Sequence, residues 1–382
     1  MRIAVAMSGG VDSSVAALLL RDEGHEVIGL SMQLWDHSGE SGRSGRCCTL
    51  DDLSDARRVA WALGIRHYVL NLEKEFRRDV VRPFVESYLG GETPIPCSAC
   101  NSRVKFATLW ERARALGCEA VATGHYARAE RRPRGVALRR AHDRDKDQSY
   151  FLYDLDAEQL AAARFPVGGM SKAEVRARAR EAQLPTAEKP ESQEICFVPP
   201  GERAGEFVAR TAPSLGLALP QAPGTLEDGS GGRRGEHAGH YRFTIGQRRG
   251  IGLSAAERLY VIAIDPQENR VVVGPGAALE SSEAALRDVR WIGAGPPPAP
   301  PSSPLRVQAR VRHRGAESAA TVYPEGDRAR VVFDAPVRAI TPGQSCVFYD
   351  GDDVLGGGVI EKRLTEGGAS RVRDPSSLRS SG

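Results

Sequence analysis

The fold is decided by the stretch IAVAMSGGVDSS, residues 3–14. Residues 3–7 are apolar and predict a buried strand, and the apolar spacing of residues 15–19 predicts a helix after the Ser-Gly-Gly turn. Glycines let a backbone turn tightly and approach a phosphate, and the unpaired N–H groups that begin a helix attract an anion. We therefore expect a phosphate site between the first strand and the first helix.

This turn differs from the commonest phosphate-binding motifs. The chain has neither the Gly-x-x-x-x-Gly-Lys-Ser/Thr pattern, whose lysine grips the end phosphates, nor Gly-x-Gly-x-x-Gly. Its Ser-Gly-Gly-x-Asp-Ser pattern instead resembles the PP-loop of ATP pyrophosphatases, which hold pyrophosphate and transfer AMP. An ordinary glycine-rich turn before a helix is the alternative, but the order of strand, turn and helix favours the phosphate site.

Length and composition set further bounds. A chain of 382 residues is expected to form two or three domains, and its formal net charge of +3 neither requires nor excludes a nucleic-acid partner. Seven cysteines, an odd number, argue against a disulfide framework and favour catalysis or metal binding. No apolar run reaches the roughly 18 residues of a membrane span, and the chain does not open on a signal-peptide pattern. We expect a cytoplasmic protein with no membrane partner.

Short apolar runs alternate with helical patterns over the first 200 residues. Strands are predicted at 25–35, 66–70 and 120–123, and helices at 49–64 and 102–117. Repeated strand–helix units are typical of an α/β fold with a doubly wound parallel sheet, whose ligands bind at the carboxyl ends of the strands. Residues 1–200 are therefore expected to form one domain around the phosphate site.

The pattern changes after residue 200. Residues 201–285 are rich in loops and predict a small central domain with a hairpin near its end. Short alternating segments within 286–363, divided by Gly, Pro and Asp, predict a C-terminal antiparallel β-barrel. Residues 364–382 are polar without an apolar period, so a disordered tail is expected.

Cys97 and Cys100 form a Cys-x-x-Cys pair in a proline-broken loop before the helix predicted at 102–117. There the helix dipole, helped by Lys105, should lower the pKa of the Cys100 thiol and favour the thiolate. The pair alone also fits half a zinc site, a redox pair, two ligands of an iron–sulfur cluster, or inert thiols. The other cysteines, the last two of which are expected in the core, are Cys196, Cys47, Cys48, Cys118 and Cys346.

A set of further patterns, taken together and in order, makes residues 1–363 resemble one family, the tRNA-specific 2-thiouridylases (the MnmA/TrmU family). The matching segments are Ala6–Ser13, Pro96–Phe106, Ala122–Ala127, Lys146–Leu152, Gly235–Gly239, Tyr241–Arg248 and Ala339–Gln344. Such enzymes replace the C2 oxygen of the wobble uridine in certain tRNAs with sulfur. The resemblance implies an adenine-nucleotide α-hydrolase-like catalytic domain, a small central domain and a β-barrel that contacts tRNA.

The resemblance also implies the chemistry. ATP, with Mg²⁺, would adenylate the uridine oxygen and release pyrophosphate. Cys196 would carry a persulfide received from a sulfur-donor protein, and Cys100, the nucleophile, would free that sulfur. A Cys100–Cys196 disulfide would remain, which a thiol reductant must open. The residues that the resemblance assigns to ATP are Ala6, Met7, Ser8, Gly9, Gly10, Val11, Asp12, Ser13, Met32 and Gly124.

Contacts to tRNA are implied in the same way. They fall on Ile95, Pro96, Cys97, His125, Lys146, Asp147, Gln148, Arg312, His313 and Gln344. Arginine clusters in all three expected domains suggest an extended phosphate track, although solvated faces are the ordinary reading of such clusters. They comprise Arg128, Arg131, Arg132, Arg134, Arg139, Arg140, Arg233, Arg234, Arg248, Arg249, Arg306, Arg310, Arg312 and Arg314.

One departure from the family pattern keeps an alternative open. The family commonly has Asn-Pro-Asp where this chain has Ile95-Pro96-Cys97, which puts that contact to the base in doubt. Cys97 also adds a third thiol, so Cys97, Cys100 and Cys196 could hold a [4Fe–4S] cluster that delivers sulfide. A PP-loop amidating synthetase and an RNA-binding or metal-storage module are the other candidates. The sequence leaves open which tRNAs are used, the identity of the donor, the role of Cys47 and Cys48, and the oligomeric state.

Overall fold

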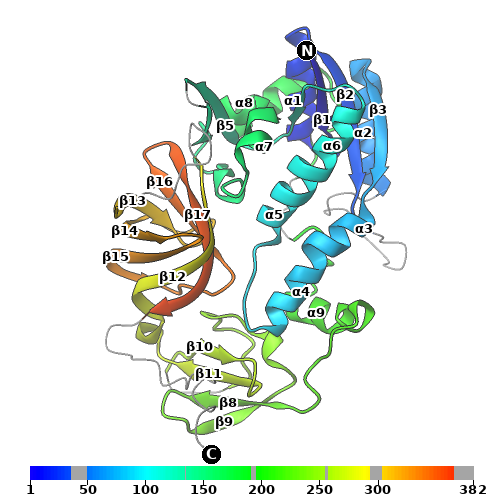
Figure 1. The fold of residues 1–382 in the computed structure, drawn as a ribbon. Coiled ribbons are helices and arrows are strands. Elements are labelled where there is room, and N and C mark those ends of the chain that lie inside the picture. Colours follow the sequence, from blue (N-terminus) through cyan, green and yellow to red (C-terminus); the bar gives the residue numbers. More distant parts are fainter. Residues whose placement is uncertain (36–49, 134, 191–194, 254–256, 293–302, 365–382) are drawn as a thin grey trace, which may run out of the picture.

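Three sheets stand at different places in the molecule: a parallel sheet with its helices, a barrel beside it, and a small sheet at the far end (Figure 1). This computed structural model describes residues 1–35, 50–133, 135–190, 195–253, 257–292 and 303–364. Cys47, Cys48, Arg134 and the expected tail beyond Leu364 lie outside the described residues. None of the helices within those ranges is long and apolar enough to cross a membrane.

The first sheet is parallel throughout, with the strand order β3-β2-β1-β4-β7. Its strands are β1 (Arg2–Ala6), β2 (Glu26–Gln33), β3 (Arg66–Asn71), β4 (Ala120–Ala122) and β7 (Ala163–Arg164). The chain runs outward from β1 to β3 and then returns to the other side of β1 at β4. Ligands of open α/β sheets bind where the strand order reverses in this way, and here the Ser-Gly-Gly turn follows β1.

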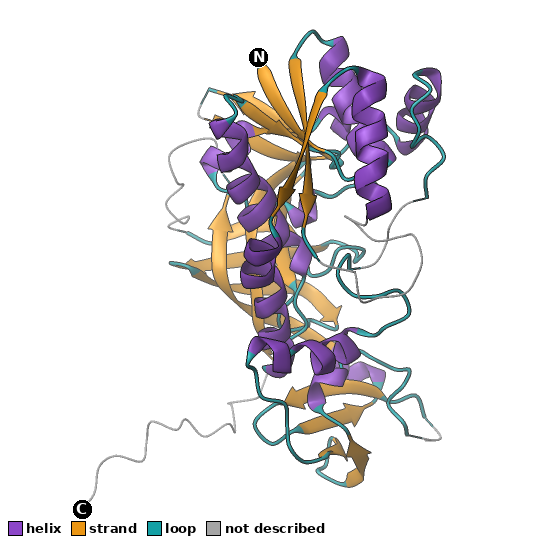
Figure 2. Ribbon diagram, turned by 90° about the vertical axis from the view of Figure 1, so that its right-hand side faces the viewer, coloured by secondary structure: helices purple, strands orange, loops and turns teal. Residues whose placement is uncertain are grey.

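Helices cover both faces of this sheet (Figure 2). Ile3 and Val5 point into one core, and Ala4 and Ala6, between and after them, point into the other, as the alternation of a strand requires. The first core is closed by α1 (Val11–Asp22), α2 (Leu50–Leu63) and α8 (Lys172–Glu181). The second is closed by α3 (Glu73–Phe76), η1 (Arg77–Val81), α4 (Arg82–Leu89), α5 (Pro96–Ala99), η2 (Cys100–Thr108), α6 (Leu109–Ala115), α7 (Ala157–Ala162) and α9 (Ala204–Thr211). The doubly wound fold expected from the sequence is confirmed.

The helix expected at 102–117 begins earlier than predicted. Three segments, α5, η2 and α6, follow one another without a break and form one long helix from Pro96 to Ala115 (Figure 1). Pro96 stands at its first position, where the missing N–H of proline costs nothing. Its middle, from Cys100 to Thr108, is wound as a π-helix, a form that is common at functional sites. Cys100 therefore lies one turn inside the helix rather than at its start.

The C-terminal barrel is closed and antiparallel, as predicted. Six strands join in the order β12-β15-β14-β13-β16-β17, and β12 pairs with β17 to close the ring. They are β12 (Glu280–Trp291), β13 (Leu305–Arg310), β14 (Ser318–Glu325), β15 (Arg328–Arg338), β16 (Ser345–Asp350) and β17 (Asp353–Leu364). A hairpin of β5 (Ala127–Arg132) and β6 (Gly135–Arg140) adds to the edge of β17, although it belongs to the first 200 residues.

The small sheet has the order β10-β11-β8-β9. Its strands are β8 (Gly224–Asp228), β9 (Arg233–His237), β10 (Tyr260–Asp265) and β11 (Arg270–Gly274). The hairpin predicted near its end is β10 and β11, and Asn269 takes a positive φ of 47° in its turn. Short 3₁₀ turns complete the fold: η3 (Ser149–Phe151), η4 (Pro166–Gly169), η5 (Pro213–Leu215), η6 (His240–Arg242) and η7 (Gly276–Leu279).

Candidate active site

The Ser-Gly-Gly turn forms a cradle, residues 8–14, at the carboxyl end of β1. Gly9 has a φ of +73°, and a Cβ atom there would lie 2.2 Å from the carbonyl oxygen of Asp52 in α2. Glycine is therefore required by both backbone conformation and space. Gly10 caps α1 in an extended conformation, which leaves the first N–H groups of the helix directed into the turn.

Hydroxyl groups hold the cradle in shape. The backbone N–H of Ser8 donates to Oγ of Ser13 at 3.2 Å, and Ser13 Oγ donates to the carbonyl oxygen of Gly10 at 3.0 Å. Ser14 Oγ donates to the same carbonyl at 2.9 Å and accepts a hydrogen bond from Thr186 at 3.0 Å. Because the serines fix the backbone, the N–H groups of the first turn are pre-organised for an anion.

Asp12 is held by two groups that the sequence analysis did not assign to the site. Nζ of Lys172 lies 2.7 and 2.9 Å from its two carboxylate oxygens, and the hydroxyl of Tyr126 donates to Oδ1 at 2.8 Å. Tyr126 stands in one of the family segments, which was a signal for its importance. Lys172 is the first residue of α8, and the Ser171–Glu174 capping box could have located that helix start, but nothing in the sequence directs the lysine toward Asp12.

The segment after β4 passes directly against the cradle. A Cβ atom at Gly124 would lie 2.6 Å from the backbone nitrogen of Ser13 and 2.7 Å from the carbonyl carbon of Asp12. The structure thus brings Gly124 together with the cradle, as the ATP assignment requires. Met7 and Met32, assigned to the same ligand, are both buried, in the two different cores of the sheet.

His125 follows Gly124 and is half-buried between the rings of Phe106 and Phe165, whose centroids lie 6.5 and 6.3 Å away. Its Nδ1 lies 2.8 Å from the hydroxyl oxygen of Thr123. Burial, with a smaller contribution from the charge of Lys105, holds the pKa of His125 well below its ordinary value. The imidazole is therefore neutral at physiological pH.

Cys100 is 8% exposed, and burial raises the pKa of its thiol, although Lys105 opposes the shift. The expected lowering of this pKa is wrong, because the helix begins at Pro96 and carries Cys100 into the core. Nζ of Lys105 donates to Oδ1 of Asn101 at 3.0 Å, and Asn101 donates to the carbonyl oxygen of Phe151 at 3.0 Å. Phe106 on the same segment, η2, packs against His125, so this part of the long helix lies beside the end of β4.

Cys196 packs against the core cluster that contains Cys100. Its neighbour Phe197 is 1% exposed and anchors the segment among aromatic rings, with centroids 5.1 Å from Phe84 and 5.2 Å from Phe207. Residues 191–194 precede this anchor and lie outside the described residues. The two cysteines implied in sulfur transfer therefore share one hydrophobic core despite their distance in the sequence.

Comparison with known proteins decides the family. A protein named tRNA-specific 2-thiouridylase MnmA from Acidobacterium capsulatum is 47% identical over 372 residues, which cover 94% of this chain and 98% of that protein. A protein of the same name from Geobacter metallireducens is 48% identical over 371 residues, covering 96% and 98%. The chain belongs to the MnmA family.

Family models match the three parts of the MnmA fold separately. One described as the tRNA methyl transferase HUP domain matches residues 1–200, and one described as the tRNA methyl transferase PRC-barrel domain matches 214–275. A third, described as the aminomethyltransferase beta-barrel domain, matches residues 281–360. A further MnmA relative, from Parvibaculum lavamentivorans, is 45% identical over 386 residues, 98% of this chain and 95% of that protein.

The residues that the MnmA resemblance assigns to tRNA fall into two groups. Gln148 lies beside the cradle, because its Oε1 accepts a hydrogen bond of 3.0 Å from the backbone N–H of Tyr126. Asp147 has a structural role instead: its side chain is buried and accepts hydrogen bonds from the backbone of Ala141 and from the N–H and hydroxyl of Ser149. Lys146 is half-buried in the same turn.

The barrel reaches toward the Cys100 helix. The ring of His313 stacks on Phe151 with 4.4 Å between centroids, and the carbonyl of Phe151 is the one bonded by Asn101. Nε2 of Gln344 donates to the carbonyl oxygen of Thr93 at 2.6 Å. Arg312, next to His313, is exposed.

Residues 89–95, which we call the strap, precede this helix and touch both other sheets. The backbone N–H of Thr93 donates to Pro342 of the barrel at 2.8 Å, and its hydroxyl lies 3.3 Å from that of Thr244 in the central part. Glu92 pairs with Arg287 of β12 at 2.7 Å. Ile95 packs on the core and Pro96 is buried, whereas Cys97 is exposed. The strap therefore fixes the position of the chain just before the helix that carries Cys97 and Cys100.

Most arginines of the expected phosphate track have acidic partners. Arg128 pairs with Asp352 at 2.5 Å, and Arg132 and Arg139 pair with Asp353 at 2.6 and 3.0 Å. These pairs attach the β5–β6 hairpin to the end of β17. Further pairs are Arg140–Glu317, Arg310–Glu317, Arg306–Asp334, Arg233–Glu236 and Arg234–Asp228.

These ion pairs show that most of the clustered arginines contact the protein itself, and the extended phosphate track stays a prediction. Among the described residues, members of the clusters without an acidic partner within 4 Å are Arg131, Arg248, Arg249, Arg312 and Arg314.

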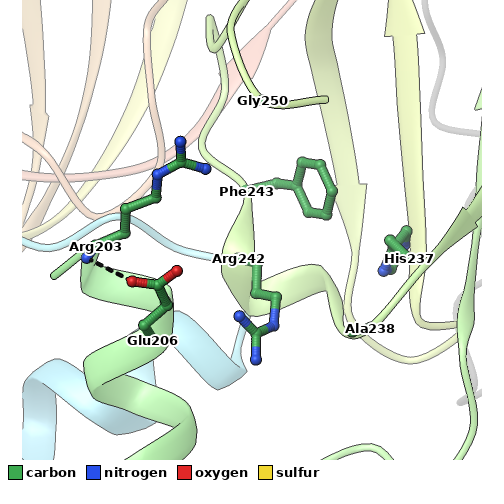
Figure 3. Close-up of a pocket in the computed structure, with 8 residues that line it drawn as sticks. Arg203, Glu206, His237, Ala238, Arg242, Phe243 and Gly250 are labelled. Carbon is green, nitrogen blue, oxygen red and sulfur yellow. Dashed lines mark hydrogen bonds between the residues drawn. The ribbon is translucent and has the colours of Figure 1, made fainter. Parts of the chain in front are cut away.

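A cavity of about 120 Å³ lies away from the cradle, where α9 meets the small sheet (Figure 3). Its lining includes Arg203, Glu206, His237, Arg242 and Phe243. Glu206 accepts a hydrogen bond from the backbone N–H of Arg203 at 3.0 Å, and both residues belong to the start of α9. None of the lining residues belongs to the cradle or carries a thiol.

Proposed function

We propose that this MnmA-family protein thiolates the wobble uridine of tRNA at C2, using ATP and a cysteine persulfide. The observation that carries the proposal is a meeting of two pieces of chemistry at the end of β4. Gly124 packs against the phosphate cradle, and the ring of the next residue, His125, lies 6.5 Å from that of Phe106 on the helical segment that begins with Cys100. Nucleotide activation and sulfur delivery then take place at one site.

The cradle serves the first step. The C2 oxygen of uridine is a poor leaving group. Its attack on the α-phosphate of ATP would attach AMP to that oxygen, which could then leave as part of AMP. The N–H groups and serine hydroxyls of residues 8–14 would bind the pyrophosphate that leaves. Mg²⁺ prefers carboxylate oxygens together with substrate phosphates, and Asp12 is the carboxylate placed to share it. Its role when bound would be to neutralise phosphate charge.

The thiols serve the second step. Cys196 would carry the outer sulfur as a persulfide supplied by a donor protein. The Cys100 thiolate would attack the inner sulfur of that persulfide, which releases hydrosulfide and forms a Cys100–Cys196 disulfide. Hydrosulfide attacks C2 of the activated uridine and AMP departs. A thiol reductant then supplies the two electrons that restore both thiols.

Recognition of the tRNA would involve both ends of this site. His125, Lys146 and Gln148 lie on the side of the cradle, and Ile95, Pro96 and Cys97 lie at the start of the Cys100 helix. His313 and Gln344, together with Arg312, approach from the barrel. Because a wobble base must leave its stack to enter the site, aromatic and polar side chains at this entrance suit the task. Asp147 would support this surface from within rather than touch the RNA.

Two other readings are less well supported. The family models are described by methyl transfer, but a methyl donor requires neither a pyrophosphate cradle nor paired cysteines. A [4Fe–4S] cluster would need Cys97, Cys100 and Cys196 gathered as ligands. Among the described residues, these three included, no three His, Cys, Asp or Glu side chains are grouped so as to hold a metal ion. The relay needs only two of these thiols, Cys100 and Cys196, and is therefore the mechanism put to the test.

The test uses purified protein, an unmodified tRNA transcript, ATP and a persulfide donor, with pyrophosphate release and 2-thiouridine measured separately. Cys196→Ser and Cys100→Ser should each abolish 2-thiouridine and leave tRNA-dependent pyrophosphate release largely intact. Cys118→Ser, a buried thiol outside the site, is the matched control and should behave as wild type. Undiminished 2-thiouridine in both variants would refute the relay. Iron and sulfide bound in stoichiometric amounts and required for activity would favour the cluster.

A further inference from the structure

A positively charged side chain, that of Lys172, contacts the cradle, although residues 8–14 themselves contain no lysine or arginine. P-loops, in contrast, place a lysine in the loop itself. Here the positive charge comes from Lys172, about 160 residues later, at the first position of α8. An anion as highly charged as pyrophosphate needs more than helix N–H groups, so the source of this charge matters for the reaction.

Contacts to both its backbone and its side chain fix the position of Lys172. Its side chain is 12% exposed, and its Nζ is within hydrogen-bond distance of both oxygens of Asp12, in the first turn of α1. Its backbone N–H donates to Oδ2 of Asp143 at 3.0 Å, and the Ser171–Glu174 capping box fixes the turn from which it extends. The ring of Tyr126 lies 5.7 Å from Nζ. Backbone and side chain are thus anchored separately.

This arrangement also balances charge in the site without nucleotide. Asp12 at the start of a helix is favourable by itself, but its negative charge opposes a polyphosphate in the same turn. Lys172 cancels that charge. Phosphate oxygens that arrive beside Asp12 offer the ammonium group a second set of acceptors, and a lysine on a flexible stem can exchange partners without moving its backbone.

We propose that Lys172 is a phosphate-binding residue of this site. Its ammonium group exchanges the carboxylate of Asp12 for the β- and γ-phosphates of ATP, and it then binds the pyrophosphate formed from them. The proposal rests on the function proposed above. It assigns Lys172 a specific ligand class, the polyphosphate, rather than the adenosine or α-phosphate part. Asp12 holds the lysine in place before nucleotide binds, and its carboxylate would become available to help hold Mg²⁺ once the lysine turns to the phosphates.

Calorimetric titration tests the proposal with three probes in the same Mg²⁺ buffer: ATP, inorganic pyrophosphate and AMP. Lys172→Gln should weaken the binding of ATP and of pyrophosphate at least tenfold and change that of AMP less than twofold. Lys172→Arg, which keeps the charge, should recover most of the loss. Arg178→Ala is the matched control, because Arg178 lies on the same helix and pairs with Asp22 and Glu181 away from the cradle.

The outcomes are separable. Unchanged affinity for pyrophosphate in Lys172→Gln would overturn the proposal, and so would equal weakening of AMP, which would mean that the lysine only supports the fold. Thermal unfolding of each variant distinguishes loss of structure from loss of a contact. A wild-type protein that binds none of the three probes would instead contradict the proposed function.

Discussion

At the scale of single residues, the site is governed by small side chains that admit close contacts. Gly9 and Gly124 are the clearest cases, since each touches backbone atoms that a side chain would displace. Cys100 shows the opposite effect, in which a reactive group is covered. Burial raises the pKa of its thiol and keeps it mostly protonated, so we expect Cys100 to be slow to oxidise.

Substitutions at two glycines distinguish the cost of a left-handed backbone conformation from the cost of a steric clash. Gly9 and Gly24 both have a positive φ, 73° and 82°, but a Cβ atom meets backbone only at Gly9. Gly24→Ala should therefore cost about 1–2 kcal/mol of unfolding free energy, the ordinary penalty of the left-handed region. Gly9→Ala should cost more and abolish ATP binding, because α1 and α2 must separate at Asp52. Chemical denaturation and nucleotide titration measure both effects, and equal losses in the two variants would contradict this account.

At the scale of elements, the strap is the part that joins the reaction helix to the rest of the molecule. Besides the bonds of Thr93, Nε2 of His240 in the central part donates to the carbonyl oxygen of Leu89 at 2.8 Å. Gly343 packs so tightly on the strap that an added Cβ atom would lie 2.9 Å from Thr93 backbone atoms. Contacts from both distal sheets therefore fix where the long helix begins.

Loosening the strap should uncover the helix that follows it. Gln344→Ala and Arg287→Ala each remove a tie to residues 92–93, and we expect alkylation of Cys100 by iodoacetamide to become several-fold faster. In wild type the exposed Cys97 should react well before Cys100, and the rate at Cys100 should rise steeply with pH, because burial raises its pKa. Peptide mapping by mass spectrometry follows both thiols.

The control for this experiment is Arg306→Ala. Arg306 also pairs with an acid on the barrel, Asp334, but at an exposed position away from the strap. Its removal should leave both alkylation rates unchanged. If the two strap variants react at the wild-type rate, the strap does not position the helix.

At the scale of the whole molecule, charge is divided between internal pairs and a few exposed arginines. Ion pairs at a protein surface typically contribute roughly 0–1 kcal/mol each, so the half-exposed pairs at Asp352 and Asp353 mainly orient the hairpin. The exposed arginines are the better candidates for RNA phosphates, and those beside His313 lie on the barrel face that reaches toward the Cys100 helix.

This division predicts the salt dependence of tRNA binding. Arg312→Ala combined with Arg314→Ala should weaken binding and reduce the slope of log K against log salt by roughly 1–2, about 0.7–0.9 for each phosphate contact. Arg132→Ala, which removes a side chain bound to Asp353, should change that slope little. Filter binding at several salt concentrations gives both values. A larger change of slope for Arg132 than for the pair would contradict the division.

The sequence was sufficient for the architecture and for the cradle, because both rest on local patterns. Residues 3–19 contain the strand, the turn and the helix, and alternating segments past 286 predict the barrel. It was insufficient for Lys172, whose meeting with Asp12 depends on how α8 packs. It also misplaced the start of the Cys100 helix, since Pro96 was read as a break rather than as a first helical position. The ion pairs of the hairpin arginines were not predicted for a related reason, because their acidic partners at 352 and 353 are distant in sequence.

The β5–β6 hairpin gives the molecule a mechanical linkage. β5 begins at Ala127, the residue after Tyr126, whose hydroxyl holds Asp12, and β6 ends bound to the rim of the barrel through Arg139 and Asp353. A displacement of the barrel would therefore be transmitted along two short strands to Tyr126 and the carboxylate of Asp12. We therefore expect the binding of tRNA at the barrel and the binding of nucleotide at the cradle to be coupled.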